Sequence, residues 1–260
     1  MKLKTLLFPF YWLLSVQFGI DPRKMFNSLR GLPRYVHDLF RFRSNYTGHF
    51  GLLPCLYDWY EDAGATRSEY FWQDLLVARK IFAANPKKHV DIGSRVDGFV
   101  AHVASFREIE VFDIRPITTQ IPGMIFKQAD FMSPVEGMAG YCDSLSCLHV
   151  LEHFGLGRYG DPINTKGFEC GLVNMAGLLR KDGIFYLSVP IGIERVEFNA
   201  RRIFDPRKLV QLADSYGLTL KEFASMRVGG ALVQSSRPWD TIIELSGFYY
   251  SLGIFVFIKQ

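Results

Sequence analysis

The sequence predicts a doubly wound α/β domain of seven strands that follows an N-terminal helical extension. From residue 68 onward, short apolar runs with strand character alternate with helical patterns, which favours a mostly parallel sheet covered by helices on both faces. One of these runs ends in a glycine-bearing turn that leads into a helix. The chain has 260 residues, 48% of them hydrophobic, and this composition supplies a sizeable core.

The expected helices and strands follow one another in chain order. Residues 68–84 place apolar side chains at helical spacing, and Pro86 marks the end of that helix. Further helices are expected at residues 96–105, 166–180 and 206–216. Strands are expected at residues 89–93, 108–113, 124–127, 143–150, 184–190, 218–225 and 252–259.

The N-terminal extension, residues 1–66, differs in charge from the domain expected at residues 67–260. The chain has a net charge of +4, and residues 1–43 hold eight Lys or Arg against two Asp, so the rest of the chain is slightly acidic. Residues 5–20 carry no charge but contain Pro9. They fall short of the roughly 20 residues that a membrane-spanning helix needs.

A second apolar pattern of the extension lies among arginines, and Pro33 is expected to begin a second helix there. The apolar positions with helical spacing are Met25, Leu29, Leu32, Val36 and Leu39. An apolar segment beside a basic amphipathic one suits peripheral contact with an anionic membrane. The alternatives are a helical cap packed on the domain and a signal or membrane-spanning segment.

The cysteines favour a reducing compartment. None of them has the spacing of a metal site or of a CxxC motif, so we expect free thiols, a cytoplasmic location and no bound metal. The four cysteines are Cys55, Cys142, Cys147 and Cys170.

Four phrases of the sequence carry a family resemblance: DIGSRVDGFVAH, HVLEHFGLGRYGDP, SVPIG and FNARRIFDP. The order of motifs over residues 68–260 resembles the class I S-adenosyl-L-methionine (SAM)-dependent methyltransferases. The phrases themselves are similar to a bacterial family known as Domain of Unknown Function 268, which tends to be associated with surface-polysaccharide genes. The resemblance implies a Rossmann-like sheet whose last strand is antiparallel, with SAM as the cofactor.

The resemblance also implies roles for acidic residues near strand ends. Asp113 is expected to hold the ribose hydroxyls of the cofactor, and Asp130 is expected to read the adenine amine. Asp113 follows Gly93 by about 20 residues, the spacing of a ribose-binding carboxylate. The alternatives are a turn role for Asp113 and a helix-cap or loop role for Asp130. The expected cofactor-binding residues are Asp91, Gly93, Ser94, Arg95, Asp113, Ile114, Asp130, Phe131 and His149.

Arg95 departs from the usual glycine-rich turn, because it stands where a second close-approach glycine would be expected. Gly98 supplies a shifted flexible position. The guanidinium would form a bidentate pair with the methionine carboxylate of the cofactor. In the alternative interpretation, Arg95 fills the cofactor space and the fold no longer binds SAM.

The HVLEH phrase follows the fourth strand and supplies three candidate catalytic residues: His149, Glu152 and His153. A neutral hydroxyl is a poor nucleophile, so methyl transfer to it requires a base, and histidine titrates near neutral pH. Glu152 would orient a histidine or act as the base itself. The alternatives are that the phrase only shapes the cofactor pocket, or that it binds a metal, although its spacing matches no metal signature.

Two polar loops, residues 157–162 and 198–206, are expected to overhang the same edge of the sheet and to bind the acceptor. Arginines in these loops would hold a phosphate or a uronate carboxylate. The alternative for Arg202 is a simple ion pair with Asp205. The expected substrate-binding residues are Arg158, Tyr159, Asp161, Asn199 and Arg202.

Together these features predict a SAM-dependent O-methyltransferase that acts on a sugar of a surface polysaccharide or of its lipid-linked precursor. The basic extension would keep the enzyme at the inner face of the cytoplasmic membrane. The alternatives are a non-catalytic scaffold in glycan assembly and a transferase that uses a nucleotide sugar. Nucleic acid is not an expected partner, because the basic residues cluster beside apolar ones in the extension.

Overall fold

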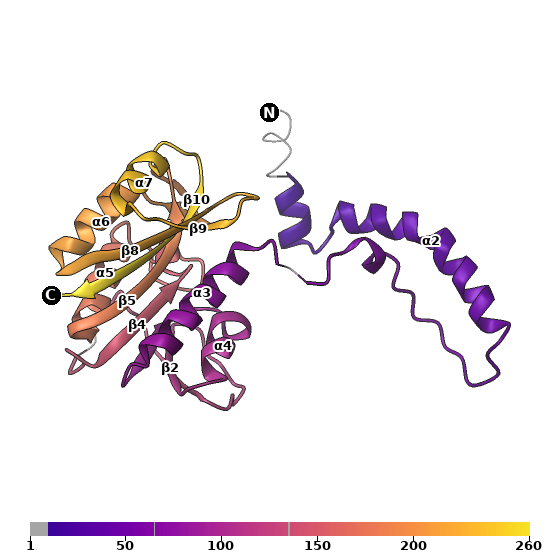
Figure 1. Cartoon of the computed structure of the whole chain (residues 1–260), viewed down its shortest axis with the longest axis horizontal. Coiled ribbons are helices and arrows are strands. Elements are labelled where there is room, and N and C mark those ends of the chain that lie inside the picture. Colours follow the sequence, from indigo (N-terminus) through magenta and orange to yellow (C-terminus); the bar gives the residue numbers. More distant parts are fainter. Residues whose placement is uncertain (1–9, 65, 135) are drawn as a thin grey trace. The chain divides into compact units, whose positions relative to one another are not determined.

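The computed structural model describes residues 10–64, 66–134 and 136–260. The chain divides into two compact units, Met1–Ala65 and Thr66–Gln260. Figure 1 shows the long helix of the first unit and the layered sheet of the second. The first nine residues of the predicted N-terminal segment lie outside the described residues.

The first unit is built around the helix α2, Pro22–Arg43. Asp21 caps its first turn by accepting a hydrogen bond from the backbone N–H of Arg23 at 2.9 Å. Pro33 lies inside this helix, so the prediction that it begins a second helix is wrong. The amphipathic pattern continues on both sides of Pro33, and the single backbone hydrogen bond that a proline removes does not interrupt it.

The chain beyond α2 returns along the same helix. A Cβ atom at Gly31 would lie 2.0 Å from the backbone oxygen of Leu56, so only glycine permits this approach. The guanidinium of Arg34 stacks on the ring of Trp59 at 3.1 Å from its centroid. The two short helical turns of this unit are η1, Leu13–Gln17, and η2, Asp58–Tyr60. Within the described residues, no helix combines the length and the apolar character needed to cross a membrane.

The second unit contains an eight-stranded sheet in the order β3-β2-β1-β4-β5-β10-β8-β9. Strands β1 to β5 run parallel to one another, and β10 is antiparallel to both β5 and β8. The predicted α/β class and the antiparallel last strand are therefore confirmed. The strands of this sheet are β1, His89–Ile92; β2, Ile109–Asp113; β3, Met124–Gln128; β4, Cys142–Leu148; β5, Leu179–Ile191; β8, Leu218–Arg227; β9, Leu232–Gln234; and β10, Ser251–Lys259.

The eighth strand, β9, corrects the expectation of seven. It pairs with the end of β8 through a turn at residues 228–231, where Gly229 has a φ of +70°. A second correction concerns the polar loop expected around Asn199, because this segment folds as a two-stranded hairpin. Its strands are β6, Arg195–Glu197, and β7, Arg201–Ile203.

Helices cover both faces of the sheet, as Figure 1 shows. One core cluster joins the sheet to α5, α6 and α7 through side chains such as Leu172, Leu209 and Ile242. The other joins it to α3 and α4 through Val77 and Val103. The helices and helical turns of this unit are α3, Glu69–Ala84; η3, Val96–Val100; α4, Ala101–Ala104; η4, Leu151–His153; α5, Gly167–Leu178; α6, Pro206–Ser215; and α7, Pro238–Leu245.

Two predicted helices differ from the observed ones. The helix expected at 166–180 ends at Leu178, and β5 begins at the next residue. The helix expected at 96–105 is broken at Gly98, whose φ of −130° and ψ of −105° are not helical. A Cβ atom at Gly98 would lie 2.7 Å from Oδ2 of Asp74, so this kink lets the chain pass closely over a buried carboxylate of α3.

Candidate active site

A cavity of about 310 Å³ opens at the edge of the sheet where β1, β2 and β4 end. Ligands bind at this edge in open α/β sheets, because the loops that leave neighbouring strands diverge there. The volume lies at the lower end of the range for small-molecule sites. The predicted site residues that line the cavity are Gly93, Arg95, Asp113, Ile114, Asp130, Phe131, His149, His153, Arg158, Tyr159 and Asp161.

The glycine turn forms one wall of the cavity, and Asp91 supports it from beneath. The buried Asp91 carboxylate accepts hydrogen bonds from the backbone and hydroxyl of Ser94 at 2.9 and 2.7 Å and from the Ser146 hydroxyl at 2.5 Å. Burial raises the pKa of Asp91 to about 7, against the effect of these donors. The sequence predicts that Asp91 and Ser94 contact the cofactor, but neither is among the described residues that line the cavity. They hold the turn in shape.

Gly93 and Arg95 occupy the tip of the turn. Gly93 has a φ of +69°, and a Cβ atom there would lie 2.7 Å from Cγ1 of Val150, so glycine is required on both grounds. The Arg95 guanidinium donates to both oxygens of Asp97 at 3.0 and 2.7 Å and lies 5.6 Å from the ring centroid of Tyr70. The cavity is therefore present with Arg95 in its wall.

Asp113 ends β2 and lines the cavity. Arg115 forms a bidentate ion pair with its carboxylate. Oδ1 accepts hydrogen bonds from the backbone N–H and from Nε of Arg115 at 2.8 and 3.0 Å, and Oδ2 accepts one from Nη2 at 2.6 Å. A carboxylate offers about four acceptor sites. Among the described residues, no further donor takes the second acceptor position of Oδ2.

Asp130 and Phe131 follow β3 on the adjoining wall. Oδ1 of Asp130 accepts the backbone N–H of Met132 at 2.8 Å, so the carboxylate organises its own loop and also faces the cavity. The ring of Phe131 packs edge-on against Phe112 at 5.4 Å between centroids. This pair forms an apolar floor between the two acidic residues.

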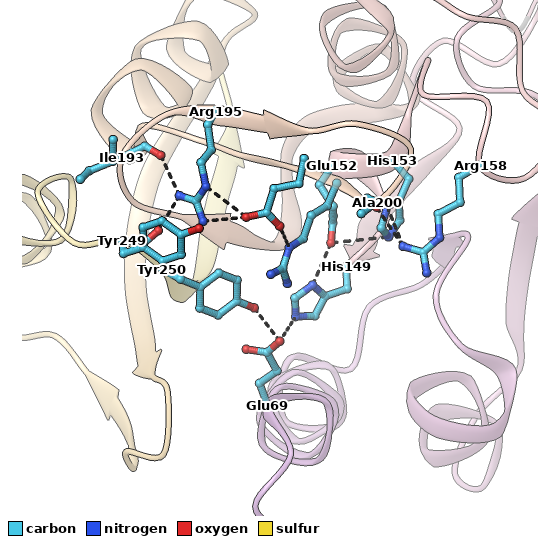
Figure 2. A network of polar contacts seen from close by, with 12 residues as sticks. Glu69, His149, Glu152, His153, Arg158, Ile193, Arg195, Ala200, Tyr249 and Tyr250 are labelled. Carbon is cyan, nitrogen blue, oxygen red and sulfur yellow. Dashed lines mark hydrogen bonds and ion pairs between the residues drawn. The ribbon is translucent and has the colours of Figure 1, made fainter. Parts of the chain in front are cut away.

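His149 follows β4 with a φ of +56° and lies between two carboxylates, as Figure 2 shows. Its Nδ1 is 2.8 Å from Oε1 of Glu152, and its Nε2 is 3.5 Å from Oε1 of Glu69. Burial lowers the pKa of His149, but Glu152 and Glu69 outweigh burial and raise it overall. Burial raises the pKa of Glu152, but His153 and His149 outweigh burial and lower it overall. Glu152 is therefore an ionised carboxylate behind the cavity, and it is not among the lining residues.

His153 differs from His149 in its hydrogen bonding. Its Nδ1 lies 2.8 Å from the backbone oxygen of Ala200. A carbonyl oxygen only accepts hydrogen bonds, so in the neutral ring Nδ1 carries the proton and Nε2, which lies 3.8 Å from Oε1 of Glu152, carries the lone pair. Burial lowers the pKa of His153, although Glu152 at 3.8 Å opposes this effect. The neutral ring is the form that accepts a proton.

The loop after η4 brings its polar side chains to the mouth of the cavity. Asp161 accepts the backbone N–H groups of Gly157 and Tyr159 at 3.1 and 3.2 Å, which orders the loop. Arg158 donates to the Ala200 oxygen at 2.9 Å, and its guanidinium lies 5.2 Å from the centroid of Tyr159. Arg158, Tyr159 and Asp161 therefore come together as the sequence predicts.

The structure does not bring Asn199 and Arg202 to the cavity. Asn199 is exposed at the turn between β6 and β7. Arg202 is buried and donates to the backbone oxygens of Glu152 and Phe154, so its charge ties loops together and does not face a ligand. The alternative pairing of Arg202 with Asp205 is also wrong, because Asp205 caps α6 and pairs with Arg207.

Three further residues of the site escape reasoning from the sequence. Tyr70 lines the cavity and packs at a tilt of 40° against the His149 ring, with 4.7 Å between centroids, and Glu69 precedes it on α3. The helical pattern of this segment marks a covering helix and contains no signal for a site. Arg115 has a local signal, because it stands two residues after Asp113 in the phrase DIRP.

Comparisons with known proteins agree with this geometry. Residues 120–227 match the family model described as "Caenorhabditis protein of unknown function, DUF268", which confirms the resemblance to that family. No curated protein matches the sequence.

Solved structures of similar fold include two methyltransferases. A putative sarcosine dimethylglycine methyltransferase from Galdieria sulphuraria is 12% identical, with a TM-score of 0.50, over 73% of this chain and 86% of that one. The unit Thr66–Gln260 has the class I methyltransferase fold. The N-methyltransferase NodS from Bradyrhizobium japonicum, solved with S-adenosyl-L-homocysteine, is 13% identical, with a TM-score of 0.50, over 77% of this chain and 91% of that one.

Proposed function

We propose that the protein is a SAM-dependent O-methyltransferase whose acceptor is a sugar of a surface polysaccharide or of its lipid-linked precursor. The observation that carries this proposal is the content of one cavity: the strand-end carboxylates of Asp113 and Asp130 face it together with the imidazole of His153. The first two suit an adenosine group, and the third suits a hydroxyl that must lose a proton. The bound product in the NodS structure supports the choice of cofactor.

The cavity fits SAM residue by residue. The open acceptor position of Asp113 would receive a ribose hydroxyl, and Asp130 would accept the adenine amine over the ring of Phe131. The methionine carboxylate would lie at the glycine turn, whose shape depends on the positive φ of Gly93 and on its close contact with Val150. Arg95 would exchange Asp97 for this carboxylate, a bidentate pair of the same geometry.

His153 is the base of the proposed reaction. Bound SAM supplies an activated methyl group for in-line transfer to the acceptor oxygen, and proximity contributes much of the rate. Nε2 of His153 would take the hydroxyl proton of the acceptor, with Nδ1 held by the Ala200 oxygen, and the sulfur–methyl bond would break to leave S-adenosyl-L-homocysteine. The ionised Glu152 at 3.8 Å stabilises the resulting imidazolium.

The loop at the mouth of the cavity supports a polyhydroxylated acceptor. One short segment of the chain offers a cation, an aromatic hydroxyl and a carboxylate, from Arg158, Tyr159 and Asp161. Sugars present both hydroxyl donors and acceptors, and a charged partner such as Arg158 would add affinity for a phosphate or a uronate. Asn199 and Arg202 have no part in this proposal.

The first unit supports binding at the inner face of the cytoplasmic membrane. Along α2, Phe26, Leu29 and Phe40 are exposed and lie between basic residues, a pattern typical of helices that bind anionic lipid surfaces. We expect the protein to float with vesicles that contain anionic lipid, and the double variant Phe26→Asp, Leu29→Asp to stay unbound. Equal flotation with neutral vesicles would contradict an electrostatic contribution.

Calorimetric titration with SAM and S-adenosyl-L-homocysteine tests the cofactor. We expect the wild-type protein to bind both ligands, and the Asp113→Asn variant to bind about 10- to 100-fold more weakly. Absence of binding in the wild type, with binding restored by Arg95→Gly, would overturn the proposal in favour of a blocked, non-catalytic scaffold. Transfer of a labelled methyl group from SAM to a cell-envelope glycan fraction then tests the acceptor.

A further inference from the structure

Glu69 and Tyr250 meet behind the cavity, although 181 residues separate them in the sequence. Glu69 lies in the first turn of α3, and its Oε1 accepts the hydroxyl of Tyr250 at 2.6 Å. The same oxygen lies 3.5 Å from Nε2 of His149. Figure 2 shows Glu69 below the imidazole and Glu152 on its other side.

This geometry decides how many protons the His149 ring carries. Nδ1 faces Oε1 of Glu152 at 2.8 Å, and Nε2 faces an oxygen of Glu69 that already accepts a hydrogen bond from Tyr250. A ring nitrogen without a proton would turn its lone pair toward a carboxylate oxygen at one end or the other. A ring protonated on both nitrogens would instead place a positive charge between the two carboxylates.

The buried charge of Glu152 makes this imidazolium necessary. The Glu152 side chain is 1% exposed, and a buried carboxylate is stable only beside a compensating charge. Among the described residues, His149 Nε2 and Glu152 Oε2 are the two buried side-chain polar atoms without a hydrogen-bond partner. The pair thus depends on charge compensation more than on a complete set of hydrogen bonds.

Other charged groups near the ring act in both directions. Arg201 on β7 opposes the imidazolium, and the buried Asp74 on α3 favours it. His153 shares Glu152 with His149, and Arg158 lies beside His153. Tyr70 and Tyr250 face the cluster as neutral hydroxyls, because burial raises the pKa of both. Glu69 is therefore the carboxylate that faces Nε2 directly.

We propose that Glu69 is a positioning residue that keeps His149 as an imidazolium, so that Glu152 stays compensated and His153 stays neutral to act as the base. The part that concerns His149 and Glu152 stands on its own. The part that concerns His153 rests on the proposed methyl transfer. Without Glu69, His149 loses the carboxylate charge that lies 3.5 Å from its Nε2. His149 then becomes neutral more readily, and Glu152 raises the pKa of His153, whose Nε2 is 3.8 Å away.

The direct test follows the imidazole nitrogens of His149 by NMR during a pH titration of the full chain. The variant is Glu69→Gln, and the matched control is Glu169→Gln, which removes a first-turn glutamate from α5. We expect the His149 midpoint to fall by about 1 pH unit or more in Glu69→Gln and to stay unchanged in Glu169→Gln. A neutral His149 at pH 6 in the wild type, or equal midpoints in both variants, would overturn the proposal, whether or not the protein transfers methyl groups.

The second test compares the acid limb of the pH–rate profile for methyl transfer. Because His153 must be neutral, activity falls as the pH drops through its pKa, and a higher pKa moves this limb to higher pH. We expect that shift in Glu69→Gln with its melting temperature reported beside it. Tyr250→Phe keeps the Glu69 carboxylate and should keep the imidazolium, so an equal shift in Tyr250→Phe would contradict the specific role of Glu69.

Discussion

The same arrangement of an aspartate with the arginine two residues later, called the bracket below, occurs at Asp113–Arg115 and at Asp205–Arg207. In both, the backbone N–H and Nε of the arginine donate to Oδ1 and Nη2 donates to Oδ2, with distances that agree within 0.1 Å. Both aspartates are nearly buried, and both arginines are about half exposed. Three consecutive residues do not impose this geometry by themselves, because in Asp21-Pro22-Arg23 the backbone N–H of Arg23 donates to the aspartate but its guanidinium lies 5.0 Å from the ring centroid of Tyr11.

The two brackets differ only in what surrounds them. Asp113 ends a parallel strand and faces the cavity, whereas Asp205 caps the first turn of α6, with Pro206 at the first helical position. An identical pair therefore serves as a candidate ribose ligand in one place and as a helix cap in the other. The position of the aspartate in the fold, and not its ion pair with arginine, therefore decides whether it can bind a ligand or caps a helix.

The largest expected effect separates the two aspartates by ligand affinity. In Asp113→Asn, a charged acceptor for the ribose becomes neutral, and we expect SAM to bind about 10- to 100-fold more weakly, as for a lost hydrogen bond to a charged group. The isosteric Asp205→Asn should bind SAM like the wild type. Calorimetric titration of both variants measures the difference. Equal losses would mean that the brackets are functionally equivalent and that the comparison fails.

The second effect separates them by stability. Asp205→Ala removes the acceptor at the N-terminus of α6, and we expect the free energy of unfolding to fall by about 1 kcal/mol. Urea denaturation followed by circular dichroism measures this change, with Asp113→Ala as the counterpart. Should Asp113→Ala be destabilised more than Asp205→Ala, Asp113 would also be chiefly structural.

The pH dependence of stability sharpens the same contrast. Arg207 holds the pKa of Asp205 below its usual range, by hydrogen bonding first and by charge second, although burial opposes this effect. A lowered folded-state pKa gives stability that is fully present above the unfolded pKa of about 3.9. That stability is lost as the pH falls through the folded-state value. We therefore expect Asp205→Asn to unfold less steeply with acid below about pH 4 than the wild type; parallel acid-unfolding curves would contradict this.

The smallest expected effect comes from the arginines. Arg207→Lys cannot keep the bidentate geometry, but the backbone N–H at position 207 still caps the helix, so the denaturation midpoint should hardly move. Arg115→Lys at the cavity should change SAM affinity more than it changes stability. A large loss of stability in Arg207→Lys would show that the exposed ion pair matters more than the cap.

Much of the fold could be predicted from short stretches of sequence. The strand β10 is a nearly continuous apolar run, and Ser68 and Asp205 precede their helices as cap residues. The errors arose where local signals were weak or were overridden. The short edge strand β9 has little apolar pattern, and Pro33 lies within a helix whose amphipathic pattern continues past it.

In the candidate site, the residues at strand ends could be predicted from the sequence, and those of the hairpin β6–β7 could not. Strand ends carry Gly93, Asp113 and Asp130 to one edge because parallel strands share their direction, so the sequence indicates that they meet. Asn199 and Arg202 are polar in the sequence as well, but the hairpin β6–β7 turns one to solvent and the other beneath the loops. No local pattern distinguishes these two outcomes.

The sequence by itself indicated that Gly93, Asp113 and Asp130 meet at one edge of the sheet and that His149, Glu152 and His153 follow the fourth strand, because strand direction and short spacings are local properties. The tertiary structure alone decided that Glu69 and Tyr250 face His149, and that the Ala200 oxygen selects the tautomer of His153. These contacts join segments 47 to 181 residues apart. They form only when both layers of helices pack on the sheet, and burial there makes each unpaired charge costly enough to require its partner.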